Sequence, residues 1–146
     1  MLFNVPANIS PEILYALARC GHGDKIVLAD ANFPSDSIGM STVLKVPLRM
    51  NGTTSEALRD VLSLMPLDQY MAKPVVVMDR VASDKEKGLQ VPAYGLLAKE
   101  AQMTVDQLDY VERFAFYEAA KTAFCVIQTS DRSLYANCII YKGVVS

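Results

Sequence analysis

The chain is poor in the residues that most often build metal and redox centres. Its 146 residues include a single histidine, His22, and three cysteines, Cys20, Cys125 and Cys138. The cysteines are odd in number and none belongs to a C-x-x-C pair, so a structural zinc site lacks ligands and a disulfide framework is not indicated. We therefore expect no metal and no other cofactor, and we expect the cysteines to be small buried residues in a reducing compartment.

Segments that bind membranes, nucleic acids or nucleotide phosphates are also missing. No stretch reaches the roughly 18 apolar residues of a membrane-spanning helix, and the first ten residues, MLFNVPANIS, have neither a basic leader nor an apolar core. Lys and Arg total 14 against 16 Asp and Glu, and no basic run stands out. The glycine-rich phosphate loops and the G-x-S-x-G motif are absent. We expect a cytoplasmic protein with neither a nucleic-acid nor a membrane partner.

What the chain does contain is an alternation of helical and strand-like apolar segments. Hydrophobic residues make up 51% of the chain, and 146 residues suffice for one domain, 1–146, with its own core. Helical spacing predicts helices at about 11–20, 53–65, 93–102 and 113–122. Continuous apolar runs predict buried strands at 26–29, 74–78, 123–127 and 138–141, with a weaker one at 42–46. The charged segment 79–88 is predicted to be a surface loop. The pattern is typical of an α/β domain with helices flanking a mixed, mostly parallel sheet.

The first candidate site is the stretch GHGDKIVLAD, residues 21–30. Gly21 is placed to end the first helix, and His22 follows it between two glycines. Asp30 ends the first predicted strand, at the edge of the sheet where ligands bind in open α/β folds. His22 is then a proton carrier or a helix cap, and Asp30 a ligand-binding carboxylate or a turn residue. The spacing alone slightly favours the capping interpretation of His22.

The second candidate is RFAFYE, at the start of the last predicted helix. Arg113 and Tyr117 are four residues apart and therefore share one helical face, where they offer a fixed cation and a phenol. The alternative is an aromatic core cluster in which Arg113 pairs with Glu118 or Glu112. By pattern alone this alternative is favoured.

Two shorter stretches add polar groups. Tyr135 and Asn137 alternate at the entrance of a strand, so both point to one side, where they bind a polyol or close a turn. Asp68 follows a predicted helix and, taken alone, is a turn residue. Acids, phenols, an amide and an arginine together suit a neutral, hydroxyl-rich small molecule.

These motifs resemble the RbsD/FucU family of sugar mutarotases, which comprises fucose mutarotases and ribose pyranases. The resemblance runs in order from ISPEILYALARCGHGD through LADANFP, PLDQY and RFAFYE to LYANCIIYKGV. It implies a compact RbsD-like α/β fold and an isomerase that interconverts anomers or ring forms of a free monosaccharide. It also implies a homo-oligomer, since members of the family form rings of ten subunits or smaller oligomers. Sites built between subunits would explain why Tyr135 and Asn137 lie far from His22 in the sequence.

The resemblance also implies roles for individual residues. His22 is the expected proton donor and Tyr117 a second catalytic residue. The expected sugar-binding residues are Asp30, Asp68, Arg113, Tyr135 and Asn137. Arg113 stands where the ribose branch tends to have histidine, which favours L-fucose. Two departures, Ala136 in place of a usual glycine and Asn32 in place of a common histidine, leave the preferred sugar open.

We hypothesise that His22 protonates one oxygen of the hemiacetal. The proton transfer at the other oxygen is carried out by Tyr117, whose phenol is influenced by the nearby Arg113 cation, or by a relay through water. Ribose pyranase-type ring isomerisation is an alternative reaction. A non-catalytic sugar-binding accessory protein of an uptake system and a structural subunit of an α/β assembly are the alternatives from other functional classes. Exchange NMR on the sugar separates these possibilities.

Overall fold

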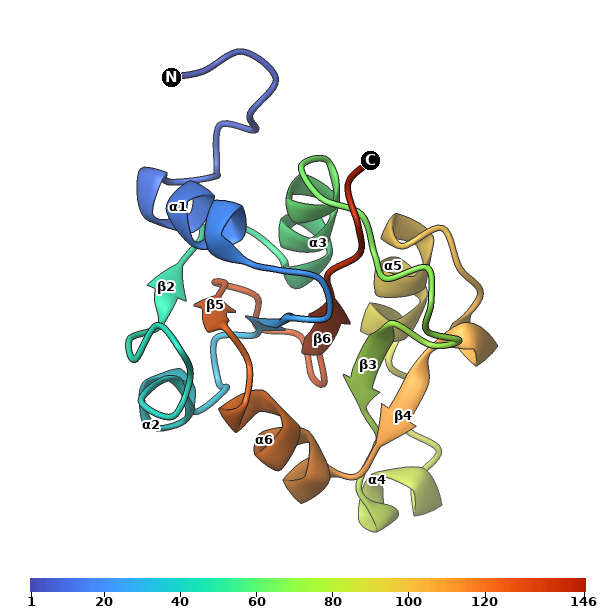
Figure 1. Cartoon of the computed structure of the whole chain (residues 1–146). Helices are drawn as coiled ribbons and strands as arrows, with labels where there is room; N and C mark the ends of the chain where they lie inside the picture. The colour runs from blue at the N-terminus through green and yellow to red at the C-terminus, as the bar shows by residue number, and fades with distance from the viewer.

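One six-stranded sheet with helices on both faces organises the chain (Figure 1). The computed structural model describes residues 1–146. Its strands are β1 (Lys25–Ala29), β2 (Leu48–Arg49), β3 (Val75–Met78), β4 (Asp109–Val111), β5 (Cys125–Gln128) and β6 (Cys138–Tyr141). Its α-helices are α1 (Pro11–Arg19), α2 (Ser35–Gly39), α3 (Thr54–Leu62), α4 (Ala82–Glu86), α5 (Pro92–Glu100) and α6 (Arg113–Lys121), and a 3-10 turn, η1, spans Val105–Gln107. None of the helices has the length and apolar character that crossing a membrane requires.

The sheet is mixed, with strand order β2-β5-β1-β6-β3-β4. Strand β6 runs antiparallel to both of its neighbours, while the other three pairings are parallel. The carboxyl ends of β1 and β3 therefore lie at the same edge of the sheet as the start of β6. The expected α/β architecture is confirmed.

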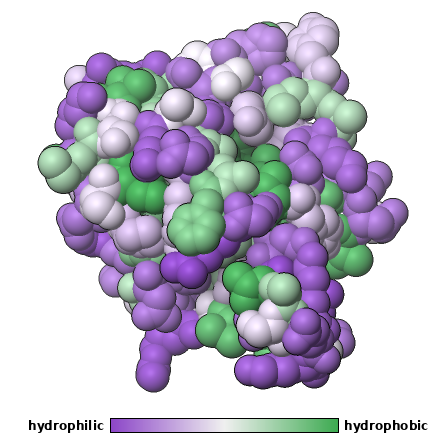
Figure 2. Space-filling model, turned by 90° about the horizontal axis from the view of Figure 1, so that it is seen from below, coloured by the Kyte–Doolittle hydropathy of each residue, from purple (hydrophilic) through white to green (hydrophobic).

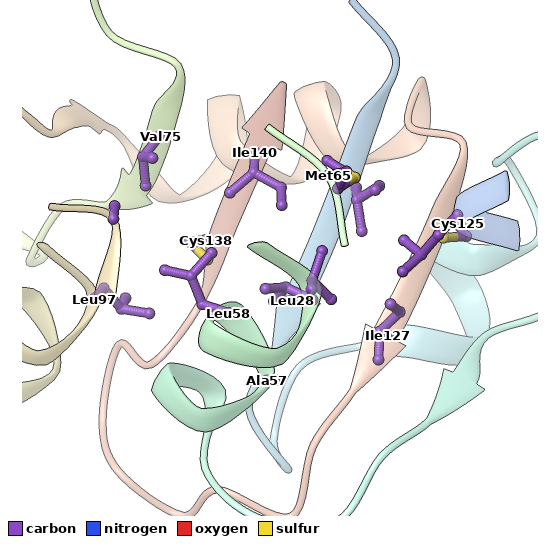
Figure 3. Packing of buried hydrophobic residues seen from close by; sticks show 14 of the residues in the cluster. Leu28, Ala57, Leu58, Met65, Val75, Leu97, Cys125, Ile127, Cys138 and Ile140 are labelled. Atoms are coloured by element: carbon purple, nitrogen blue, oxygen red, sulfur yellow. The ribbon is translucent and has the colours of Figure 1, made fainter. Parts of the chain in front are cut away.

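Two apolar layers hold the helices against the sheet. Helices α1, α3 and α5 pack on one face, against side chains that include Leu28, Ile127 and Ile140 (Figure 3). Helices α2 and α6 cover the other face, where Phe116 is fully buried. Burial of both faces explains why the central strands are continuous apolar runs rather than alternating ones. All three cysteines are buried and free, as expected.

Capping side chains fix where the helices begin. The Ser10 hydroxyl accepts from the Ile13 N–H at the start of α1. Thr53 and Glu56 form a reciprocal capping box on α3. The Glu112 carboxylate accepts from the Phe114 and Ala115 N–H groups, which fixes the start of α6.

The prediction of a strand at 42–46 is wrong. This segment forms turns, and only its Val43 and Leu44 N–H groups reach the carbonyls of Ala123 and Phe124. Val43 is 57% exposed, so the apolar run does not reflect burial. The strand at this edge is instead the two-residue β2, which follows the segment.

Five short elements were not expected from the sequence. They are α2, β2, the edge strand β4, the 3-10 turn η1, and α4, which lies within the charged segment 79–88. No residue of α4 is buried, so the sequence carries no helical apolar period there.

Candidate active site

A cavity of about 270 Å³ lies at the sheet edge where β1 and β3 end and β6 begins. Figure 2 views the molecule from below Figure 1, and hydrophilic and apolar residues are interspersed on the face that it shows. The wall of the cavity comprises Asp30, Asn32, Phe33, Met78, Val81, Asp84, Arg113, Tyr117, Leu134, Tyr135 and Asn137. Five of the seven residues expected at the site therefore lie together.

Asp30 and Asn137 form a reciprocal pair in the cavity wall. The Asn137 amide donates from Nδ2 to Asp30 Oδ2 at 2.8 Å, and its Oδ1 accepts from the Asp30 N–H at 2.8 Å. They meet across 107 residues because the antiparallel pairing of β6 with β1 brings the start of one strand beside the end of the other. Burial raises the pKa of Asp30, and N–H bonds from Asn32 and Asn137 oppose this shift.

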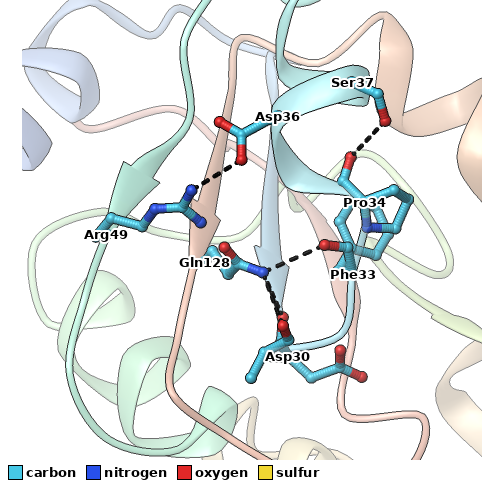
Figure 4. Close-up of polar contacts among 8 residues, drawn as sticks. Asp30, Phe33, Pro34, Asp36, Ser37, Arg49 and Gln128 are labelled. Atoms are coloured by element: carbon cyan, nitrogen blue, oxygen red, sulfur yellow. Dashed lines mark hydrogen bonds and ion pairs between the residues drawn. The ribbon is translucent and has the colours of Figure 1, made fainter.

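Asp30 is also the turn residue that its sequence context suggested. Its Oδ1 accepts from the Asn32 N–H at 2.9 Å, so the binding and turn interpretations are compatible. Gln128 secures the same turn, because its side-chain amide lies 3.2 Å from the carbonyls of Asp30, Ala31 and Phe33 (Figure 4). Sequence reasoning missed Gln128, which has no motif around it.

Arg113 and Tyr117 meet on the exposed face of α6. Arg113 Nε donates to the Tyr117 hydroxyl at 3.2 Å, and the guanidinium carbon lies 5.5 Å from the centre of the phenol ring. The alternative ion pairs of Arg113 are not formed, because Glu112 caps α6 and Glu118 pairs with Lys121. The cation and the phenol therefore lie together in the cavity wall.

Tyr135 crosses from the β5–β6 loop to the loop after β3. Its hydroxyl accepts from the Val81 N–H at 3.1 Å and donates to Asp84 Oδ2 at 2.6 Å. Partial burial raises the pKa of Tyr135, and the bond to Asp84 adds to the shift. Asp84 was not among the expected residues, and the charged run that contains it offered no reason to single it out.

His22 and Asp68 form a second polar pair away from this cavity. His22 Nε2 lies 3.0 Å from Asp68 Oδ1, which also accepts from the Tyr70 N–H at 3.0 Å. The imidazole does not cap α1, because its only hydrogen bond is to Asp68, and the Cys20 N–H bonds the Leu17 carbonyl at the end of the helix. The Tyr70 and His22 hydrogen bonds hold the pKa of Asp68 below its ordinary value. The His22 side chain is 47% exposed and thus open to a ligand.

The His22–Asp68 pair and the cavity around Asp30 lie at opposite ends of strand β1. His22 precedes β1 and Asp30 follows it, and the five residues of β1 span about 16 Å. The Asp68 N–H bonds to the Tyr141 carbonyl at the far end of β6 from Asn137. Closeness in sequence suggested that His22 and Asp30 work on one scaffold, but the direction of β1 separates them within a chain.

The chemistry of this cavity belongs to its carboxylates, phenols, amide and guanidinium. No group of three or more His, Cys, Asp or Glu side chains is arranged to hold a metal ion. The donors and acceptors in the wall match hydroxyl groups, which both give and accept hydrogen bonds.

Comparisons with known proteins identify the family of the chain. The RbsD / FucU transport protein family matches residues 4–145. The fucose mutarotase of Homo sapiens is 48% identical over an alignment of 149 positions, which covers 99% of this chain and 95% of that protein. The structure of FucU from Bifidobacterium longum is 40% identical, with a TM-score of 0.86 over 98% of this chain and 99% of that one. The fucose mutarotase from Streptococcus pneumoniae in complex with L-fucose is 36% identical, with a TM-score of 0.79 over 99% and 100%. The chain therefore belongs to the RbsD/FucU family.

Proposed function

We propose that the protein is a mutarotase that interconverts the α and β anomers of a free monosaccharide, with L-fucose as the preferred sugar. The observation that carries the proposal is the cavity in which the Asp30–Asn137 pair lies beside the Arg113–Tyr117 pair. The names of the relatives and the L-fucose complex of the Streptococcus pneumoniae protein support the reaction and the sugar.

Mutarotation opens the cyclic hemiacetal and closes it on the other face. One proton must reach the ring oxygen and another must leave the anomeric hydroxyl, and positioned acid–base groups accelerate such steps by about a hundredfold or more each. On opening, Tyr117 gives its proton to the ring oxygen, and Arg113, whose Nε lies 3.2 Å from the phenol oxygen, stabilises the negative charge that develops there. On closing, Tyr117 takes the proton back from the sugar hydroxyl that attacks the carbonyl carbon. Asp30, Tyr135 and Asn137 hold the sugar hydroxyls.

His22 supplies the second acid–base group. Since Nε2 faces Asp68, Nδ1 is the nitrogen that remains for the substrate. In this scheme Asp68 acts on the reaction mainly by orienting the imidazole, and any contact that it makes with the sugar is secondary. Because about 16 Å of strand separates His22 from Asp30, we infer that His22 enters the cavity of a neighbouring copy. The working protein is then a homo-oligomer.

Exchange NMR on L-fucose tests the reaction. The protein is expected to accelerate exchange between the anomeric proton signals, and a folded His22→Ala variant is expected to lose most of that acceleration. Saturable sugar binding without faster exchange would instead identify an accessory sugar-binding protein. Faster exchange between the ring forms of D-ribose, with none for L-fucose, would identify the pyranase reaction.

A mixing experiment tests the shared site. His22→Ala and Tyr117→Phe subunits are each expected to be inactive alone. When the two are co-expressed, random assembly gives an intact His22 and an intact Tyr117 at about one quarter of the junctions, so about a quarter of the wild-type activity returns. If both residues acted within one chain, no activity would return.

A further inference from the structure

Tyr135 adopts a backbone conformation that residues other than glycine rarely take. Its φ is +58°, in the left-handed region. Its phenol is meanwhile held by the Val81 N–H at 3.1 Å and by Asp84 Oδ2 at 2.6 Å. Both partners lie on the segment after β3, so these bonds fix the phenol where the β5–β6 loop meets α4.

Asp84 is the member of α4 that faces inward. It is half-buried and lines the cavity, while the other four residues of the helix are exposed. No residue of α4 is buried, and its neighbour Lys85 is occupied with Asp79 at 2.6 Å. The helix therefore contributes no core packing, and its main side-chain contact with the cavity is a carboxylate.

We propose that Asp84 is a further sugar-binding residue that also selects neutral sugars. This inference rests on the proposed function. Asp84 Oδ2 takes the phenol proton, whereas Oδ1 makes no hydrogen bond within the chain and is free to accept from a sugar hydroxyl. The proton of Tyr135 is committed to Asp84, so Tyr135 meets the sugar as an acceptor.

Asp84 also determines the net charge of the cavity. Its charged groups are the Asp30 and Asp84 carboxylates and the Arg113 guanidinium, which leave one net negative charge. A second carboxylate in a small, partly enclosed space repels phosphate esters and acid groups, while neutral hydroxyls donate to it. Asp84 therefore separates a free sugar from its phosphorylated form.

The experiment compares Asp84→Asn with Glu86→Gln as the matched control. Glu86 lies on the same helix, is exposed and does not line the cavity. Asparagine keeps the size of the side chain and an oxygen that accepts the Tyr135 proton, so α4 stays attached. For Asp84→Asn we expect the affinity for L-fucose to fall about tenfold, as for the loss of one charge-assisted hydrogen bond, with kcat changing by less than about twofold. Glu86→Gln should match the wild type.

Two further measurements separate a contact with the sugar from a structural role. Among the monodeoxy L-fucoses, one is expected to bind the wild type and Asp84→Asn equally, because it lacks the hydroxyl that Asp84 accepts. L-fucose 1-phosphate is expected to bind Asp84→Asn better, relative to free L-fucose, than it binds the wild type.

Failure of this inference is distinguishable from failure of the proposed function. If the wild type binds L-fucose and accelerates its exchange, but Asp84→Asn has the sugar affinity and ester preference of Glu86→Gln, Asp84 has only a structural role. If the wild type neither binds L-fucose nor accelerates its exchange, both proposals are overturned.

Discussion

Replacing Asn137 by Asp converts the reciprocal pair with Asp30 into two facing carboxyls. The Asn137 oxygen that accepts the Asp30 N–H is retained, but the donor 2.8 Å from Asp30 Oδ2 becomes a second oxygen. Two ionised carboxylates at that distance repel by about 6 kcal/mol at an effective dielectric constant of about 20. Taking up one proton at pH 7, against an ordinary Asp pKa of about 3.9, costs only about 4 kcal/mol. We therefore expect the Asn137→Asp variant to bind a proton that the two carboxyls share.

The shared proton makes the loss of stability dependent on pH. The pair holds its proton more tightly when folded than when unfolded, so its folded pKa lies above its unfolded value. The penalty is absent below the unfolded pKa and grows by about 1.4 kcal/mol per pH unit until the folded pKa is passed. Relative to the wild type, Asn137→Asp should lose about 4 kcal/mol at pH 7 and about 1.5 kcal/mol at pH 5.

Urea unfolding at fixed protomer concentration, followed by circular dichroism at pH 5, 6, 7 and 8, measures this difference. Asn8→Asp is the matched control. Asn8 is exposed, so its replacement by Asp introduces the same charge without a facing carboxylate. A loss for Asn137→Asp that is equal at pH 5 and pH 8 would indicate a packing defect and refute the reasoning.

Three further changes have defined outcomes. Gly143→Ala places a Cβ in collision with the Leu67 carbonyl oxygen, next to Asp68, so it should reduce the His22-dependent activity measured by exchange NMR, while sugar binding at the cavity persists. Thr53→Ala removes half of the α3 capping box and should lower the free energy of unfolding by about 1 kcal/mol in urea titrations, whereas Ser55→Ala, whose hydroxyl bonds the Thr53 hydroxyl but none of the helix N–H groups, should have a smaller effect. Burial raises the pKa of each cysteine thiol to about 12, so the folded protein should react with a thiol reagent at pH 8 far more slowly than the urea-unfolded chain, and rapid native labelling would contradict the burial of Cys20, Cys125 and Cys138.

The sequence predicts the elements that have strong local determinants. Ser10 and Pro11 mark the start of α1, and the apolar runs mark β1, β3, β5 and β6, because both faces of the sheet are buried. Helix α4 and strand β4 were missed because they are short and their burial does not follow a regular period. The run at 42–46 misled because several of its apolar residues face solvent.

The candidate site was likewise predicted where local motifs define it and missed where they do not. Motifs identified five residues that the structure brings to one cavity: Asp30, Arg113, Tyr117, Tyr135 and Asn137. Sequence distance was a poor guide to contact: eight residues carry the chain from His22 across the sheet to Asp30, whereas Asp30 and Asn137 touch because β6 turns back beside β1. Asp84 and Gln128 act through loop geometry that no local pattern encodes.

The placement of the His22–Asp68 pair and the cavity at opposite edges of the sheet has a consequence for assembly. If each copy lends its imidazole to a neighbour, every junction between copies completes one reaction centre. A closed arrangement then has as many working centres as subunits, whereas an open row leaves an unmatched imidazole at one end and an unmatched cavity at the other. Catalytic output per chain would in that case measure how completely the assembly has closed, and dilution that separates the subunits would lower activity while each fold stays intact.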